Sequence, residues 1–523
     1  MLFEVRYSDL AGRIGKIKTP SGTFETPAFI PVIHPVSQSV DTEFLKKLGF
    51  EAVITNAYIA LKQYGDIARE RGIHKIINFD GPIMTDSGGY QVLEYGSIEP
   101  EPSYIAQFEN DIQSDICVPL DKPTGYGLSY DVAERYVNET MKNSQETMNL
   151  IKSNNNRNSV WVGPVQGAEH LDLVKRSAEL LDEMGYEMMA LGSPVQLLES
   201  YEFAILADMI ATLKTTVMSK PIHLFGAGHP LTIPLAVALG CDTFDSASYM
   251  LYARDNRYMH PNGTSRLDKL TYLSCQCPIC ISMTVKEFVG LEHNEKIDKL
   301  AKHNLYVLRS EVLSVKQAIM EGRLWEYVGQ KARAHPKLME AFKLFVNYKH
   351  LEDGTPMFKK KAIFFMESID QYRPEACRVR KIFSSFSTDK KMIILFPDTQ
   401  VSPFYCSQEY HKLSSKFSDS QICAYNPFIG IIPSEISDVY PAAHNLISRK
   451  KFDFNNAKDY PTFVSSLENF LSHNFFDDVI VVADDFMQGI IQDIHILSKN
   501  LKIIEHNDNV IEQLLSSDNS KSR

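Results

Sequence analysis

The sequence predicts an α/β protein whose first half folds as a (β/α)8 barrel. Short apolar runs recur through the first 250 residues, and most of them end in a polar or glycine-rich turn. The stretches between most of these runs have helical periodicity, as in residues 170–185, where five apolar side chains fall on roughly one face. Strands that alternate with helices in this way indicate a parallel sheet. Seven or eight such units fit a closed barrel, and from pattern alone an open doubly wound sheet is the alternative.

Each expected strand of the first half is one of these apolar runs. They are EAVITNAYI (51–59), GPIMTDSGG (81–89), DICVPLD (115–121), SVWVGPVQG (159–167), MMALGS (188–193), PIHLFGAG (221–228) and CDTFDS (241–246). Chemistry in a barrel takes place where the strands end, so Asp86, Asp121, Gln166 and Asp245 are candidate site residues. A single Asp at a strand end is more often a helix N-cap, and only the clustering of several such positions favours a site.

The second half of the chain predicts a smaller domain with α/β or α+β structure. Residues 282–345 have helical spacing, and the chain turns polar near residues 350–356, where we place a domain boundary. Residues 1–345 and 350–523 are therefore the expected domains. The apolar runs of the second domain are 361–366, 392–397, 427–433 and 478–484.

Composition excludes several classes of protein. The 523 residues carry a net charge of −11 and include no run of about 18 apolar residues, which excludes a membrane-spanning helix. The N-terminus lacks a signal-peptide pattern, so we expect a cytoplasmic protein. Eight cysteines are too few for a disulfide scaffold. Residues 251–350 have a net charge of +6, and a solvated helical surface explains this about as well as an RNA contact does.

Three of the eight cysteines form the strongest motif of the chain. The spacing is Cys275-x-Cys277-x-x-Cys280, and His303 follows after 22 intervening residues. Three thiolates and an imidazole satisfy tetrahedral zinc, and a site closed by four protein ligands is structural. His293 competes for the place of the fourth ligand. We expect one structural Zn²⁺ ion per chain.

The second motif is MTDSGGYQ at residues 84–91. Two glycines directly after a strand allow a flat ligand to approach the backbone closely. Asp86, next to them, is suited to accept N–H groups from a heterocycle or to act as an acid and base. A phosphate loop is less favoured, because no Lys stands where a Walker motif needs one. The chain has no motif for a redox or nucleotide cofactor.

Taken together, these segments resemble the tRNA-guanine transglycosylase family, and specifically its archaeal branch. The resemblance covers residues 1–345. It rests on MTDSGGYQV (84–92), GPVQGA (163–168), ALGSPV (190–195), LFGAGHP (224–230), CDTFDSASY (241–249) and the cysteine–histidine group. The family implies a (β/α)8 barrel with an inserted zinc-binding subdomain, here at about residues 270–310, and a homodimer. It also implies a glycosyltransferase (pentosyltransferase) that exchanges guanine 15 in the D-loop of tRNA for preQ0, the 7-deazaguanine precursor of archaeosine.

The resemblance implies a role for each candidate residue. Asp245 matches the nucleophile that forms a covalent bond to ribose, and Asp86 matches the acid/base that contacts the exchanged base. Arg254 and Arg257 match residues that grip phosphates beside the target nucleotide. Ser193 stands where bacterial members often have glycine. The positions that match the base-binding pocket are Ser87, Asp121, Gln166, Gly192 and Ser193.

Residues 350–523 resemble the C-terminal domains of archaeal members, and YNPFIGIIPSEISDVYPAAH (425–444) resembles a segment of archaeosine synthase, a paralogous amidotransferase. Asp398, Ser402 and Tyr410 replace the cysteine, lysine and histidine of that paralogue's signature. Amidotransferase activity is therefore not expected, and a role in positioning tRNA or a purely structural role remains. No clear PUA domain, a small RNA-binding module, is recognisable. A separate PUA-domain protein is thus a candidate partner.

Two other functions are compatible with the resemblance. One is a non-catalytic tRNA-binding subunit of a transglycosylase, which the presence of all four strand-end candidates disfavours. The other is a queuosine-type transglycosylase that acts on the anticodon. The archaeal-type VPLDKPT segment (118–124) and the long C-terminal extension disfavour this second alternative.

Overall fold

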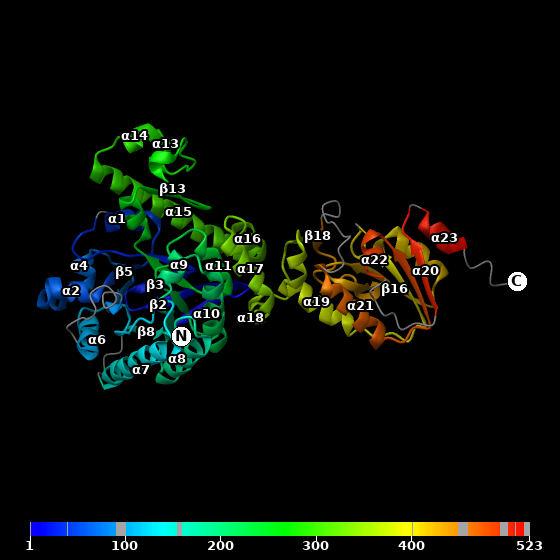
Figure 1. Ribbon diagram of the computed structural model, residues 1–523, viewed down its shortest axis with the longest axis horizontal. Coiled ribbons are helices and arrows are strands. Elements are labelled where there is room, and N and C mark those ends of the chain that lie inside the picture. Colours follow the sequence, from blue (N-terminus) through cyan, green and yellow to red (C-terminus); the bar gives the residue numbers. More distant parts are fainter. Residues whose placement is uncertain are drawn as a thin grey trace. The chain divides into compact units, whose positions relative to one another are not determined.

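The computed structural model describes residues 2–38, 40–89, 101–153, 159–399, 401–447, 459–491, 500–507 and 509–516. The chain forms two compact units, Met1–Gly354 and Thr355–Arg523, each with its own sheets and helices (Figure 1). Among the described helices, none combines the length and the apolar character needed to cross a lipid bilayer.

The first unit contains an eight-stranded parallel sheet that closes on itself. Its order is β4-β11-β10-β9-β8-β7-β6-β5, and a parallel bridge between Val32 and Ile54 joins the two end strands. This barrel confirms the predicted fold class and excludes the open doubly wound sheet. The strands are β4 (Ala28–Pro31), β5 (Val53–Asn56), β6 (Ile83–Asp86), β7 (Ile116–Cys117), β8 (Val160–Val165), β9 (Met188–Leu191), β10 (Ile222–Leu224) and β11 (Thr243–Ser246).

Every barrel strand except β4 lies inside an apolar run that the sequence analysis identified. The strand β4 follows a three-stranded antiparallel sheet with no helix between them, so the alternation that indicated the other strands is missing there. This sheet consists of β1 (Phe3–Asp9), β2 (Gly12–Thr19) and β3 (Gly22–Thr26). Phe3 and Phe24 of the sheet share one apolar core with Ile30 and Met84 of the barrel.

Helices cover the outside of the barrel and alternate with its strands (Figure 1). The stretch predicted as helical at 170–185 is α8, whose buried face includes Leu173, Val174 and Leu181. An apolar stripe of this kind packs a helix against the sheet. The helices are α1 (Thr42–Leu48), α2 (Ala57–Tyr64), α3 (Asp66–Arg71), α4 (Ile73–Ile77), α6 (Pro102–Asp111), α7 (Tyr130–Ser153), α8 (Leu171–Met184), α9 (Val195–Glu199), α10 (Phe203–Thr216) and α11 (Thr232–Leu239).

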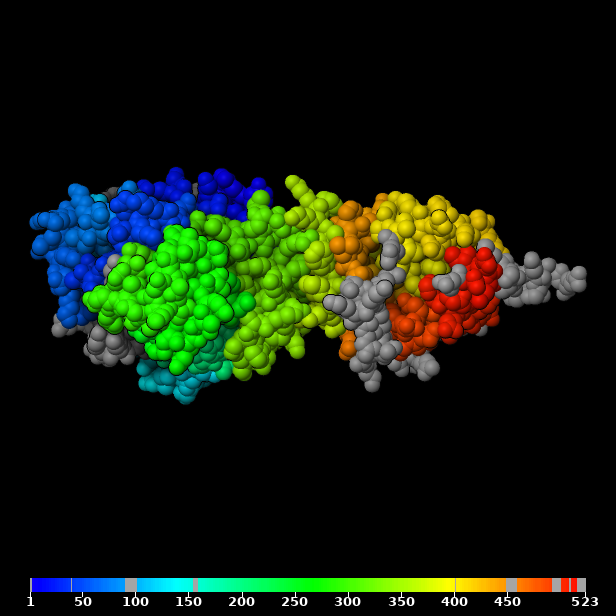
Figure 2. Space-filling view, turned by 90° about the horizontal axis from the view of Figure 1, so that it is seen from above, coloured from blue at the N-terminus to red at the C-terminus, as the bar shows by residue number. Residues whose placement is uncertain are grey.

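The segment after β11 carries the cysteine motif and is mostly helical, as predicted for residues 282–345. It lies at the front of the first unit in Figure 2, in green. Its long helix α15 packs against α12 and β12. The elements are α12 (Ser248–Arg254), β12 (Arg257–His260), β13 (Gly263–Arg266), α13 (Pro278–Ile281), α14 (Val285–Val289), α15 (His293–Glu321), α16 (Leu324–Ala332), α17 (Pro336–Lys343) and α18 (His350–Gly354).

The second unit is built on a five-stranded sheet of order β17-β16-β15-β19-β20, in which only the β16–β17 pair is antiparallel. Each of the four predicted apolar runs contains a strand, whereas β16, β18 and β20 were not predicted. The strands are β14 (Ile363–Phe365), β15 (Met392–Pro397), β16 (Ser420–Asn426), β17 (Gly430–Pro433), β18 (Asn445–Ile447), β19 (Asp478–Ala483) and β20 (Asn500–Glu505). The helices are α19 (Pro374–Ser384), α20 (Gln408–Lys416), α21 (Pro461–His473), α22 (Asp485–Ile490) and α23 (Val510–Ser516).

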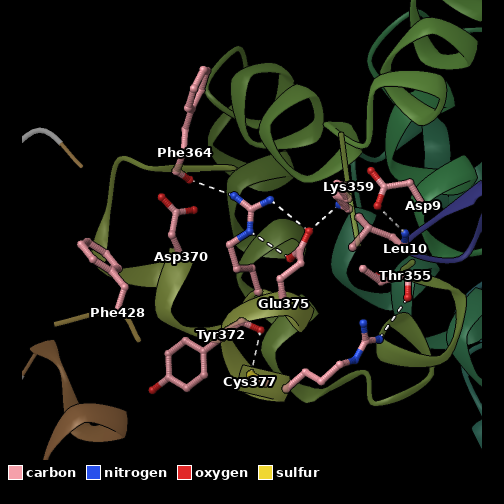
Figure 3. A network of polar contacts seen from close by, with 12 residues as sticks. Asp9, Leu10, Thr355, Lys359, Phe364, Asp370, Tyr372, Glu375, Cys377 and Phe428 are labelled. Carbon is pink, nitrogen blue, oxygen red and sulfur yellow. Dashed lines mark hydrogen bonds and ion pairs between the residues drawn. The ribbon is translucent and has the colours of Figure 1, made fainter. Parts of the chain in front are cut away.

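A buried ionic network connects the first elements of the second unit (Figure 3). The guanidinium of Arg373 donates to both carboxylate oxygens of Glu375, at 3.0 and 3.2 Å, and to the carbonyl of Phe364 at 2.8 Å. Lys359 forms an ion pair with the same carboxylate. These charged side chains are at most 2% exposed. Removing one partner of such a group leaves an uncompensated buried charge, so the network fixes β14 and the preceding loop to α19.

A second polar cluster ties the N-terminal sheet to the start of β6 and β7. His74 Nε2 lies 3.1 Å from Asp115 Oδ2 and 3.1 Å from Ser21 Oγ. Asp115 also accepts the backbone N–H groups of Ser21 and Ile83, at 2.7 and 2.8 Å. The hydrogen bond to Asp115 raises the pKa of His74. Burial raises the pKa of Asp115, but the hydrogen bonds from His74 and the two N–H groups outweigh it, and the pKa is lowered.

We expect the stabilisation contributed by His74 to disappear as the pH rises. Its pKa is higher in the folded protein than the value of about 6.5 in the unfolded chain. The stabilisation is therefore complete below the unfolded pKa and is lost as the pH passes through the folded pKa. Thermal unfolding of the wild type and His74→Gln between pH 5 and 9 measures this. The variant should be less stable than the wild type by about 1.5 kcal/mol at low pH, and this difference should become smaller as the pH rises. A difference that stays constant with pH would contradict the prediction.

Candidate active site

The carboxyl ends of the barrel strands bring the predicted polar residues to one rim. Asp86 ends β6, Gln166 directly follows β8, and Asp245 lies in β11. Asp121 follows β7 in a loop. The negative charges of Asp121 and Asp245 both raise the pKa of Asp86, after the larger effect of burial, so the three carboxyls lie within electrostatic reach of one another.

Asp86 is tuned to titrate near neutral pH. Its side chain is partly exposed at the rim, yet the loss of surrounding water raises its pKa to about 7, and the neighbouring carboxylates contribute. Asn56 Nδ2 donates to Asp86 Oδ2 at 3.3 Å, and the N–H of Gly88 also donates to the carboxyl. A carboxyl with such a pKa populates both protonation states at neutral pH, which general acid and base catalysis requires.

Ser87 and Gly89, which follow Asp86, shape the site in different ways from an ordinary strand end: the first is a buried hydroxyl without a partner in the described part of the chain, and the second is a glycine against a carboxylate. Ser87 is fully buried, and its hydroxyl has no hydrogen-bond partner among the described residues. Such unpartnered buried groups are uncommon, and a bound molecule is one way to satisfy them. A Cβ atom on Gly89 would collide with Asp121 Oδ1, so only glycine lets this carboxylate lie against the backbone.

Asp121 and Gln166 form the centre of a hydrogen-bonded wall. Gln166 Nε2 donates to Asp121 Oδ2 at 2.5 Å. Gln166 Oε1 accepts the N–H and the hydroxyl of Thr124, at 3.0 and 2.9 Å, and the hydroxyl of Ser193 at 3.1 Å. These three donors orient the amide, so its NH₂ group faces Asp121. Burial raises the pKa of Asp121 to about 6, against the opposing effect of the Gln166 hydrogen bond.

Gly192 and Ser193 complete this wall through their backbone. A Cβ atom on Gly192 would overlap Gln166 Nε2, so glycine is needed for the close approach. Ser193 has a φ angle of 59°, in the left-handed region that favours glycine. Glycine would adopt this backbone without strain, and serine adds the hydrogen bond to Gln166.

Asp245 is a carboxylate with one oxygen held and the other open. Its Oδ1 accepts the N–H of Gly226 at 3.1 Å and lies 3.0 Å from Nε2 of His223, which is fully buried. His223 Nδ1 in turn lies 2.9 Å from Thr243 Oγ1. In the described part of the chain, no hydrogen bond involves Asp245 Oδ2. A fixed carboxylate with a free oxygen is the arrangement that a nucleophile requires.

Behind the rim lies a buried carboxyl that the sequence analysis missed. Glu109, on α6, is fully buried, and its Oε1 accepts the hydroxyl of Thr85 at 2.7 Å. The N–H of Val118 also donates to this carboxyl. Because Thr85 precedes Asp86 and Val118 follows β7, Glu109 links the strand ends that carry Asp86 and Asp121. Burial raises the pKa of Glu109 well above its usual range, which makes the neutral acid its stable form.

We expect Glu109→Gln to be nearly as stable as the wild type and Glu109→Ala to be less stable by about 2–4 kcal/mol. The amide oxygen of glutamine can accept the same two hydrogen bonds, whereas alanine leaves a cavity and a buried hydroxyl without its acceptor. Thermal and urea unfolding of both variants measure the difference. Equal destabilisation of the two would mean that the acidic proton itself is needed.

The four predicted metal ligands lie together. The ligand atoms of Cys275, Cys277, Cys280 and His303 are all within 4.8 Å of one another. His303 Nδ1 lies 3.5 Å from Cys277 Sγ and 3.3 Å from Cys280 Sγ, while Nε2 lies 2.9 Å from the carbonyl oxygen of Met259. This carbonyl fixes the ring so that Nδ1 faces the thiolates.

Neighbouring side chains support a metal centre of this kind. Tyr258 stacks on the ring of His303 with centroids 3.8 Å apart, and its hydroxyl lies 3.5 Å from Cys280 Sγ. The same hydroxyl accepts the N–H of Cys275 at 3.3 Å. His293, the competing candidate, begins α15 and is outside the cluster. Three thiolates and one imidazole form a closed set of ligands, so a metal bound here would be structural.

The two candidate phosphate-binding arginines lie beyond β11. Arg254 ends α12 and is exposed, with no ion pair to any carboxylate that the structure describes. Arg257 begins β12, and its Nε pairs with Asp255 Oδ2 at 2.7 Å. The side chain of Arg257 is still 43% exposed, so both guanidiniums are accessible to an anion.

The sequence analysis did not identify three further residues of the rim, for different reasons. Asn56 is a polar residue at the end of a predicted strand, and the rule that identified Asp86 applies to it equally. His223 interrupts an apolar strand with an ionisable side chain, which is a recognisable signal. Thr124 lies in a loop, and nothing in its sequence context indicates that it holds Gln166.

Comparisons with known proteins place the chain in a family. The chain matches the queuine tRNA-ribosyltransferase family over residues 9–337. A protein of Saccharolobus solfataricus called tRNA-guanine(15) transglycosylase is 42% identical over 453 residues, which cover 84% of this chain and 89% of that protein. Proteins of the same name from Sulfolobus acidocaldarius (40% over 445 residues; 84% and 87%) and Methanosarcina acetivorans (38% over 474 residues; 90% and 91%) are also similar. The chain belongs to the queuine tRNA-ribosyltransferase family, a family of glycosyltransferases that modify tRNA.

Proposed function

We propose that this protein is a tRNA-guanine(15) transglycosylase that replaces guanine 15 in the D-loop of tRNA by preQ0 through a covalent bond between Asp245 and ribose. The observation that carries the proposal is the pairing of two carboxyls on one rim. Asp245 is oriented and keeps Oδ2 open, while Asp86 has a pKa of about 7. The choice of position 15 is supported by the names of the similar archaeal proteins.

The first half of the exchange breaks the bond between guanine and ribose. The target nucleotide must be extruded from the folded RNA before its ribose can reach Asp245. Asp245 Oδ2 attacks the anomeric carbon, and the electron pair of the glycosidic bond leaves with the base. Asp86, in its protonated form, gives a proton to a ring nitrogen of the departing guanine. A carboxylate suits the nucleophile because it stabilises the positive charge that develops on the sugar.

The second half reverses these steps with a different base. The carboxylate of Asp86 accepts the proton from the ring nitrogen of preQ0, which attacks the anomeric carbon and releases Asp245. Asp121, with the NH₂ of Gln166 fixed against it, accepts the amide and amino N–H groups that guanine and preQ0 share. Ser87, Gly192 and Ser193 line the rest of the pocket, and Arg254 and Arg257 hold the adjacent phosphates.

We also propose that the ion of the cysteine–histidine cluster is Zn²⁺, which fits the donor set. It would connect the segment after β13 to α15 and take no part in the exchange. A homodimer, a cytoplasmic location and a separate PUA-domain partner are proposals from the family resemblance. For residues 350–523, we propose a tRNA-positioning or structural role. Asp398 stands in place of the paralogue's cysteine and accepts a hydrogen bond from Asn426 at 3.1 Å. We therefore propose no amidotransferase activity for this domain.

The exchange of radiolabelled guanine into an unmodified archaeal tRNA transcript tests the function. We expect zinc-replete protein to incorporate label at position 15, and preQ0 to compete with guanine. Label in the anticodon would instead favour a queuosine-type enzyme. If no label is incorporated while tRNA still binds, the protein is the non-catalytic subunit or an enzyme that awaits a separate RNA-binding partner.

A further inference from the structure

A stacked pair of aromatic rings lies at the same end of the barrel as the rim, outside the base pocket. Tyr201 lies in the turn between α9 and α10, and its ring stacks on the imidazole of His335, with centroids 4.7 Å apart and planes inclined by 13°. Phe203 is nearly perpendicular to both rings, with centroids 5.8 Å from Tyr201 and 6.2 Å from His335.

These distances leave one face of the Tyr201 ring uncovered by its aromatic neighbours. If Phe203 covered the outer face of Tyr201, it would be much farther from His335 than from Tyr201. The two distances are nearly equal, so Phe203 lies beside the stack and not on top of it. Consistent with this, Tyr201 is 43% exposed. Among the described aromatic side chains, none besides His335 stacks on the Tyr201 ring.

The backbone of Tyr201 is held in an unusual conformation. Its φ angle is 57°, a region that bulky side chains rarely adopt and that glycine or asparagine would occupy at lower cost. The turn is fixed by hydrogen bonds from Tyr201 N to Leu198 O, at 3.3 Å, and from Glu202 N to Leu197 O, at 2.9 Å. A large aromatic ring is thus kept exposed at a position that disfavours it, which is a reason to look for a ligand.

The stack is connected to the catalytic rim through α9. Val195, the first residue of α9, packs against Gly226, whose N–H holds Asp245. Five residues separate Val195 from Tyr201, and the helix α9 between them is about 7.5 Å long. Tyr201 therefore lies one short helix away from the strand ends that carry the site.

Charged groups lie around the same platform. Burial raises the pKa of Tyr252, the charge interactions with Tyr201 and Glu199 add to this effect, and Arg257 opposes it. One phenol thus lies within electrostatic reach of Tyr201, of the Arg257 guanidinium and of the Glu199 carboxylate. An aromatic face beside an accessible guanidinium is the combination that binds a base and its phosphate.

We propose that Tyr201, supported by His335, is a stacking platform for an unpaired base of the tRNA next to the target nucleotide. The inference rests on the proposed function, because it takes tRNA as the partner. When the target nucleotide leaves its stack, a neighbouring base loses a stacking surface, and an aromatic ring can replace it whatever the sequence. Arg257 would then bind the phosphate that follows this base.

Kinetics of Tyr201→Ala and Tyr201→Phe test the platform. For alanine, we expect the KM for tRNA to rise about tenfold, with the KM for guanine and kcat close to those of the wild type. Phenylalanine keeps the ring and should behave as the wild type. Tyr7→Ala is the matched control, since Tyr7 is 50% exposed and lies on β1 of the N-terminal sheet. An unchanged KM for tRNA in Tyr201→Ala, or a Phe variant as defective as the Ala variant, would overturn the proposal.

A direct readout of stacking separates this proposal from a structural role and from the failure of the proposed function. A tRNA with 2-aminopurine beside position 15 should lose fluorescence when it binds the wild type or Tyr201→Phe, and much less when it binds Tyr201→Ala. This measurement needs binding and no catalysis, so it remains informative if no exchange is observed. Equal quenching by all three proteins, or a loss of self-association in Tyr201→Ala without a change in quenching, would overturn the platform.

Discussion

Replacement of Asp245 by asparagine is expected to reduce base exchange about 10³-fold or more while tRNA binding and the fold persist. The amide has the shape of the carboxylate, and its oxygen can still accept the N–H of Gly226 that Oδ1 accepts in the wild type. It lacks the negative charge and the nucleophilic oxygen, so the bond to the anomeric carbon cannot form. Initial rates of guanine incorporation measure the loss.

A second measurement distinguishes a lost nucleophile from a disturbed site. The wild type, mixed with tRNA and denatured, should retain a covalent protein–RNA adduct, and Asp245→Asn should not. Asp80→Asn is the matched control, because Asp80 is an exposed aspartate whose side chain pairs only with Lys46, at 2.5 Å, in the described part of the chain. An adduct that persists in Asp245→Asn would assign the nucleophile to another residue, and Asp86 would be the first to examine.

Much of the rim could be predicted because a parallel barrel gathers residues that are distant in the sequence. Asp86, Gln166 and Asp245 each follow or end an apolar run, and parallel strands bring all such ends to one side. The prediction needed only the strand ends, and it did not need the pairing of the strands. The strand β4 was not predicted, because an antiparallel sheet precedes it where a helix precedes each of the other barrel strands.

The chemistry of the rim could not be predicted in the same way. The pKa of Asp86 depends on burial and on two carboxylates that are distant in the sequence, and neither distance nor burial is encoded locally. Glu109 appears in the sequence as one charged residue in an amphipathic helix, yet it lies fully buried between two strand ends. Gln166 was recognised as a base-binding candidate, but the three donors that orient it come from two separate loops.

Loss of the metal is expected to destabilise the first unit by several kcal/mol, since binding at a structural zinc site contributes directly to folding. Three ligands come from residues 275–280 and the fourth from α15. Without the ion, Tyr258 still links the two parts, because its ring stacks on His303 and its hydroxyl accepts the N–H of Cys275, but these contacts are weak. We expect His303→Ala, or treatment of the wild type with a chelator, to lower the unfolding temperature and to weaken tRNA binding through the displaced Arg257.

The chain supplies close controls for this prediction. His293 lies on the same helix as His303 and outside the cluster, so His293→Ala should retain one zinc ion per chain and the wild-type unfolding temperature. Cys406→Ser is the control for the cysteine ligands, because Cys406 is exposed and distant in the sequence from residues 275–280. Metal analysis of the purified variants gives the stoichiometry, and thermal unfolding gives the stability. Retention of zinc and stability by His303→Ala, with their loss in His293→Ala, would reverse the assignment of the fourth ligand.

Full stability of the metal-free wild type would show instead that packing of Tyr258 and α15 is sufficient to hold this segment.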